Sequence, residues 1–125
     1  MNKNDLICYR YIMNHYKELK EEFDKFSNYD EFKDNIVVKK AIVLDFIQIG
    51  ENVNKLSDEV KNKINKLDIR GVIDFRNRLV HGYGNIDYKI VYNTIKNSLP
   101  SLISQLSDYF ITEYNCNITK INESV

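Results

Sequence analysis

The sequence has few of the residues that build metal sites and disulfide frameworks. Its 125 residues include only two cysteines and two histidines. Cys8 and Cys116 lie near opposite ends without a CxxC pair, and His15 and His81 are far apart. The spacing typical of zinc ligands is therefore absent, and we expect neither a metal site nor a cofactor.

A long apolar run is also missing. Residues 1–20 mix charges with apolar residues at helical spacing and lack the uninterrupted apolar core of a signal peptide or a membrane span. We therefore expect a cytoplasmic protein with reduced thiols.

The chain has no net charge, because 18 Lys and Arg residues balance 18 Asp and Glu residues. No global basic field draws such a protein to nucleic acid, so RNA binding would require a local patch. Only Arg10, Arg70, Arg76 and Arg78 are arginines. Two of the four lie in one short segment, which makes residues 76–83 the place to look for such a patch.

Signals for β-structure are absent, whereas apolar residues recur every three or four positions, as in amphipathic helices. This spacing predicts an all-α, up-and-down bundle of four to five helices in a single domain. The expected helices cover residues 6–26, 30–53, 57–67, 72–80 and 87–110. We expect residues 1–114 to form the helical domain and residues 115–125 a polar tail.

Several residues suggest where these helices begin and end. Ser57 and Asp87 are suitable N-caps. Gly82 and Gly84 can adopt the left-handed conformation that stops a helix. The single proline, Pro100, is expected to kink or restart the last helix.

The helix that ends near residue 80 carries an unusual charge. On a helical wheel Arg76 falls in the apolar arc, where a guanidinium is costly unless it reaches water or is paired. Asn77 and His81 are four residues apart and so adjacent on the polar face, and Arg76 directly precedes Asn77. The three side chains can therefore converge at the helix end. We also consider Glu51, on the second helix, as the partner that balances Arg76, or alternatively as a solvated surface acid.

This set of side chains suits phosphodiester chemistry. Histidine exchanges protons near neutral pH, and arginine binds a phosphate or the charge that develops on it. No carboxylate cluster suitable for magnesium adjoins the segment, which favours metal-free cleavage through the RNA 2′-hydroxyl. Structural roles fit the same residues: His81 as a helix C-terminal cation, Arg76 in an internal ion pair, and Tyr83 as a partly buried aromatic.

The segment Arg76–Tyr83, RNRLVHGY, resembles the Arg-Asn-x-x-x-His-x-Tyr motif of HepT-like HEPN ribonucleases. Ile49-Gly50-Glu51 resembles the Ile-Gly-Glu of that family, and Leu99-Pro100-Ser101-Leu102 resembles part of its last helix. The resemblance implies a homodimeric toxin whose two motifs face a shared cleft. It implies that Arg76 and His81 are catalytic and that Asn77 assists them.

The resemblance also implies a mode of control, in which a cognate MNT-type nucleotidyltransferase antitoxin attaches AMP to Tyr83. Two copies of Arg76, Arg78 and His81 across the dimer would supply the local basic patch for RNA. The substrate stays open between transfer RNA and messenger RNA. The alternative is a catalytically inactive HEPN module that binds a nucleotide or a partner protein.

Overall fold

Helices follow one another along the chain in the computed structural model, which describes the backbone of residues 2–123 and the side chains of residues 2–82 and 84–116. The α-helices are α1 (Lys3–Phe23), α2 (Tyr29–Asp34), α3 (Ile36–Lys55), α4 (Asp58–Lys61), α5 (Lys66–His81), α6 (Tyr88–Asn93) and α7 (Leu99–Glu123). A 3-10 turn, η1 (Tyr83–Asn85), and a π-helical turn, η2 (Thr94–Ser98), complete the order. The described residues contain no strand, and the predicted all-α fold is confirmed.

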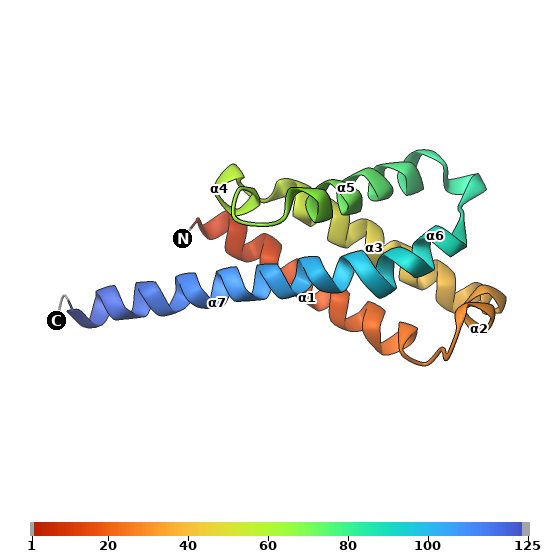
Figure 1. Ribbon diagram of the computed structural model, residues 1–125, viewed down its shortest axis with the longest axis horizontal. Coiled ribbons are helices and arrows are strands. Elements are labelled where there is room, and N and C mark those ends of the chain that lie inside the picture. Colours follow the sequence, from red (N-terminus) through yellow and green to blue (C-terminus); the bar gives the residue numbers. More distant parts are fainter. Residues whose placement is uncertain (1, 124–125) are drawn as a thin grey trace.

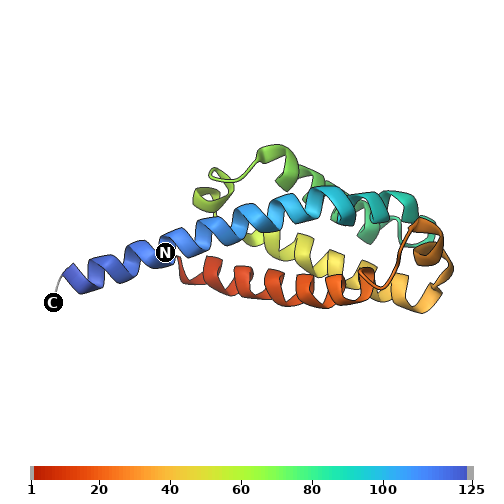
Figure 2. The same ribbon diagram turned by 60° about the horizontal axis from the view of Figure 1, so that its bottom comes forward.

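The four long helices form the predicted up-and-down bundle (Figure 1). Helix α3 packs on both α1 and α5, and α7 packs on α5 and α1. Their apolar faces meet in one core, in which Ile12, Phe46, Val72 and Leu106 are all buried. The C-terminal part of α7 projects beyond the rest of the bundle, past the N-terminus (Figures 1 and 2). No helix in the described part of the chain is both long and apolar enough to cross a membrane.

The second predicted helix is divided at Asn35, so its assignment to a continuous span of residues 30–53 is wrong. Asn35 has extended backbone angles, φ −94° and ψ 91°, and its side chain accepts a hydrogen bond from Val38 N at 3.0 Å. An asparagine side chain competes in this way with the helical hydrogen bonds of the backbone. The short α2 turns Phe32 into an aromatic cluster with Phe23 and Tyr92. The regular apolar spacing of the sequence continues across this break and hides it.

The third and fourth helices also differ from their predicted bounds. Ser57 caps α4 as expected, with its hydroxyl accepting from Val60 N, but α4 ends after one turn at Lys61. The next helix, α5, begins at Lys66 rather than at Val72, because the Asn65 side chain caps it. The first turns of α5 contain three charged residues and Gly71, which hide the early start even though Ile69 is buried three residues before Val72.

Helix α4 is held to α1 by a buried acid. Asp5 is 2% exposed, and its two carboxylate oxygens accept hydrogen bonds from Ser57 N at 2.7 Å and Ser57 Oγ at 2.6 Å. The same serine caps α4, so one residue both begins the helix and fixes it to the bundle.

Helix α5 ends without a left-handed glycine, which contradicts the expectation for Gly82 and Gly84: no described glycine has a positive φ. Gly82 has φ −112°, its N–H donates to Arg78 O at 2.8 Å, and a Cβ at this position would lie 3.0 Å from the same oxygen. Gly82 therefore suits this helix end because it has no Cβ to crowd the Arg78 oxygen, and not because it adopts a left-handed conformation.

The last part of the chain is a nearly continuous helix. Asp87 caps α6 as predicted, accepting from Lys89 N and Ile90 N. The sequence predicts a kink or a new helix start at Pro100, but the structure has the π-helical turn η2 just before it, in which Leu99 N donates to Thr94 O. The helix then continues directly into α7. A π-turn just before a proline helps the chain accommodate the missing N–H. The α7 backbone is helical to Glu123, past residue 114 where the sequence predicts a polar tail.

Candidate active site

The predicted site occupies the end of α5, where this helix lies against α3. Arg76 is partly buried, with 23% of its side chain exposed. Its Nη1 donates a hydrogen bond to Asn77 Oδ1 at 2.8 Å, and its Nη2 lies 3.9 Å from Glu51 Oε2 on α3. The Nε atom is buried and has no hydrogen-bond partner among the described residues. The contacts with Asn77 and Glu51 thus hold the Arg76 guanidinium at the edge of the interface between α3 and α5.

A glycine of α3 makes this position possible. A Cβ on Gly50 would lie 2.5 Å from Arg76 Cβ and 2.7 Å from Arg76 Cγ. Since non-bonded carbons normally stay about 3.5–4.0 Å apart, no larger residue fits without moving α3 or α5. The aliphatic stem of Arg76 therefore packs directly on the α3 backbone, and its guanidinium emerges beside Glu51.

Sequence reasoning did not assign a role to Gly50. The signal was available, because a glycine inside a helix costs about 1 kcal/mol relative to alanine and so indicates a close approach. Glu51 does lie opposite Arg76, as one of the two interpretations of that residue proposed. Glu51 Oε1 is also 3.4 Å from Lys55 Nζ, so the carboxylate is shared between two cations.

The other motif residues differ in their surroundings. Asn77 is half-buried and bonded to Arg76, whereas His81 is exposed and forms no hydrogen bond or ion pair with another described residue. Arg76 and Asn77 are therefore brought together as predicted. His81 lies one turn further along α5 and makes no hydrogen bond or ion pair with either of them, so the convergence of all three side chains stays a prediction. A histidine free of internal partners at a helix end is available for proton exchange with substrate.

Arg78 and Tyr83 lie around the corner of the helix end. Arg78 is exposed and lines a hollow of about 90 Å³ with Phe75, Gly82 and Asp87. Arg78 lies two residues after Arg76, about 200° around α5, and makes no hydrogen bond with Arg76 or Asn77. Tyr83 begins η1, directly after the end of α5, and its side chain lies outside the described residues.

A separate cluster of possible metal ligands joins α1 to α3. His15 Nδ1 lies 3.0 Å from Asp45 Oδ1 and 3.9 Å from Glu18 Oε2. Burial and the neighbouring Glu18 raise the pKa of the Asp45 carboxyl, and its hydrogen bond to His15 acts in the opposite direction. This is the one described group of three such side chains with ligand atoms within 4.8 Å of one another, and it contains no motif residue.

Comparison with known proteins supports the resemblance. A family model described as Ribonuclease HepT-like matches residues 7–108, which include all of α3 and α5 and the whole motif. The chain belongs to the HepT-like ribonuclease family. The fold described above is therefore a HepT-like helical bundle.

Two relatives show how far this HepT-like chain has diverged. It is 29% identical over 102 residues to the Methanocaldococcus jannaschii protein named "Putative RNase MJ1216", covering 82% of this chain and 84% of the relative. It is 26% identical over 85 residues to the Thermococcus cleftensis protein named "Probable ribonuclease HepT", covering 68% and 77%. No solved structure matches the chain.

Proposed function

We propose that the protein is a metal-independent endoribonuclease that acts as the toxin of a toxin–antitoxin pair. The observation that carries the proposal is the Arg76 guanidinium, directed by Gly50, Glu51 and Asn77 to the helix end where His81 is exposed. A fixed cation and a free imidazole near the same helix end can together promote cleavage of RNA by its own 2′-hydroxyl. Family membership supports the same reaction class.

In the proposed reaction, the 2′-oxygen attacks the adjacent phosphorus as His81 accepts the 2′-hydroxyl proton. The bond from phosphorus to the 5′-oxygen of the next nucleotide breaks, and that oxygen takes up a proton. The products are a 2′,3′-cyclic phosphate and a 5′-hydroxyl. Arg76 stabilises the negative charge on the non-bridging oxygens, and Asn77 holds Arg76 in position.

A homodimer with a shared cleft is part of the proposal, and an exposed apolar stripe on α3 supports it. Val37 is 78% exposed and Leu44 58%, and Ala41 between them is also exposed. These positions lie on one face of the helix, two turns before Glu51. Burying this stripe against a second copy would bring the two Arg76 side chains, with Arg78 and His81, to one cleft.

Control by a cognate MNT-type nucleotidyltransferase completes the proposal. The phenolic oxygen of Tyr83 would attack the α-phosphate of ATP, which transfers AMP and releases pyrophosphate. Tyr83 is two residues from His81, so the added phosphate and adenine would compete with RNA for Arg76. We expect intact-mass measurement to show AMP on the Tyr83 peptide after incubation with antitoxin and ATP, and Tyr83→Phe to escape it. Equal silencing of Tyr83→Phe without ATP would point to occlusion by binding instead.

The decisive experiment incubates the purified protein with RNA in excess chelator and analyses the fragment ends. We expect fragments ending in a 2′,3′-cyclic phosphate, and loss of cleavage in His81→Ala. Because His81 is exposed and unpaired in the described structure, the melting temperature of this variant should match that of the wild type. Cleavage by His81→Ala at the wild-type rate contradicts the assignment. No cleavage by the wild type would favour the catalytically inactive binding module.

A further inference from the structure

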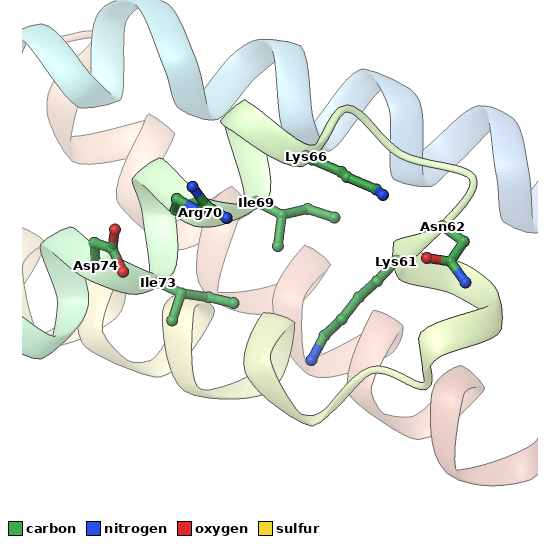
Figure 3. A pocket seen from close by; sticks show the side chains of 7 residues that line it. All are labelled: Lys61, Asn62, Lys66, Ile69, Arg70, Ile73 and Asp74. Atoms are coloured by element: carbon green, nitrogen blue, oxygen red, sulfur yellow. The ribbon is translucent and has the colours of Figure 1, made fainter.

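A second positively charged region lies at the other end of α5. Helix α4 and the first turns of α5 enclose a cleft of about 320 Å³, which we call the α4–α5 cleft (Figure 3). Three cations line it, Lys61, Lys66 and Arg70, together with the amide of Asn62. Ile69 and Ile73 form an apolar floor. Asp74 is the single acid in the lining.

The charges of this cleft are poorly neutralised. Lys66 and Arg70 are exposed and make no hydrogen bond or ion pair with any residue that the structure describes. Lys61 Nζ donates to the backbone oxygen of Asn54 at 2.6 Å, a neutral partner that leaves its charge unbalanced. By contrast, Lys20 and Lys25 each pair with an acid on or near their own helix. In a chain without net charge, three cations around one acid form a local anion site.

The α4–α5 cleft and the proposed active site lie on the same face of α5. At about 100° per residue, Lys66, Arg70, Asn77 and His81 fall within an arc of about 60° on α5. Arg70 precedes His81 by 11 residues, which corresponds to about 16 Å along the helix axis at 1.5 Å per residue. One helix face therefore leads from the cleft to the exposed imidazole.

We infer that the α4–α5 cleft is an accessory RNA-binding site, which holds backbone phosphates of the substrate about five stacked nucleotides from the scissile bond. This spacing follows from the 16 Å separation and a rise of about 3.4 Å per nucleotide. The inference rests on the proposed ribonuclease function. Lys66 and Arg70 bind the phosphates, and the two isoleucines pack against a sugar or base.

Charge and shape favour RNA over an acidic protein as the occupant. A nucleic acid strand presents a phosphate at every nucleotide, so it can contact the cleft and the motif at the same time along one helix face. The accessory site would strengthen binding without touching the reacting atoms. Removing it should therefore raise KM and leave kcat nearly unchanged.

The test compares the wild-type protein with the double variant Lys66→Gln, Arg70→Gln. Binding is measured by fluorescence anisotropy with a labelled 12-nucleotide DNA oligonucleotide, which lacks the 2′-hydroxyl and is not cleaved, across a range of salt concentrations. We expect the slope of log affinity against log salt to fall by about 1.4 in the double variant, since each lost phosphate contact on a single strand contributes about 0.7. The variant Lys66→Arg, Arg70→Lys should restore most of the slope.

The matched control removes the same charge elsewhere. Lys3 and Lys17 of α1 are exposed, and Lys3→Gln, Lys17→Gln should keep the wild-type slope. In cleavage assays the double variant should lose activity on a 12-nucleotide RNA through KM, and should cleave a trinucleotide, too short to reach the cleft, like the wild type.

The two proposals fail in different ways. If the double variant binds and cleaves the long RNA like the wild type, the accessory site is overturned and the ribonuclease assignment stands; the cleft is then free for another ligand, such as an acidic protein. If the wild type cleaves no RNA but the oligonucleotide slope still falls in the double variant, the cleft binds nucleic acid and the proposed enzymatic function is what fails.

Discussion

Replacing Gly50 with alanine should displace Arg76, because the added methyl group would overlap the base of its side chain. The new Cβ would lie 2.5 Å from Arg76 Cβ, so α3 and α5 must separate by about 1 Å to restore normal contact. Overpacking of this kind costs about 1–3 kcal/mol. We expect the upper part of that range, because the clash involves Arg76 Cβ, which is bonded directly to the backbone, and not a flexible side-chain end.

A gain in helix propensity opposes this cost. Alanine in a helix interior is about 1 kcal/mol more favourable than glycine. The expected net loss for Gly50→Ala is therefore about 1–2 kcal/mol, or about 4–8 °C in Tm at about 4 °C per kcal/mol for a chain of this length. Thermal unfolding followed by circular dichroism measures it.

Activity should fall further than stability. A displacement of about 1 Å at a catalytic group can lower the rate about 100-fold. Well below the Tm of the variant, where it is folded, Gly50→Ala should show this loss in kcat, with a small change in KM. The reasoning depends on Arg76 being held by the α3 backbone in the position from which it acts.

Gly71 provides the matched control on α5. Beyond its own helix backbone and its chain neighbours, a Cβ at this position would meet no atom within 4 Å, so Gly71→Ala should gain about 0.5–1 kcal/mol from helix propensity alone and keep wild-type kcat. If the Tm of Gly50→Ala rises as that of Gly71→Ala does, or if Gly50→Ala retains full activity, the proposed contact between Gly50 and Arg76 does not control the site.

Two further predictions concern the buried Asp5 and the partly buried Asp45. Asp5→Ala leaves Ser57 N and Oγ without their acceptors, so we expect a loss of about 2–4 kcal/mol in urea unfolding, with Asp5→Asn less affected; an unchanged midpoint would show that water replaces the carboxylate. Burial raises the pKa of Asp45 above its ordinary 3.8. The ionised carboxylate therefore lowers the free energy of unfolding, and this loss grows as the pH rises from 3.8 through the folded pKa. The Tm of Asp45→Asn relative to wild type should therefore increase as the pH rises from about 3.8 through the folded pKa of Asp45; a difference that falls with pH would mean that the bond to His15 outweighs burial.

Local features of the sequence were sufficient to predict much of this protein. The three- and four-residue apolar spacing predicted the all-α bundle, and Ser57 and Asp87 were correctly identified as caps. The charge of Arg76 in an apolar arc and the resemblance to a family motif together pointed to residues 76–83; family membership is confirmed, and the roles of these residues stay a prediction. The fold and cap predictions succeed because helix periodicity and capping depend on residues within a few positions of one another.

The tertiary structure decided what depends on residues far apart in the sequence. Gly50 and Arg76 are 26 positions apart, and only the packing of α3 on α5 shows that the glycine makes room for the arginine. The α4–α5 cleft likewise requires the early start of α5 at Lys66, which places Lys66 and Arg70 on the helix face that carries Asn77 and His81. The sequence pointed to residues 76–83 as a local basic patch, but the second cationic region at the α4–α5 cleft follows from how two helices are packed, and local periodicity does not encode that packing.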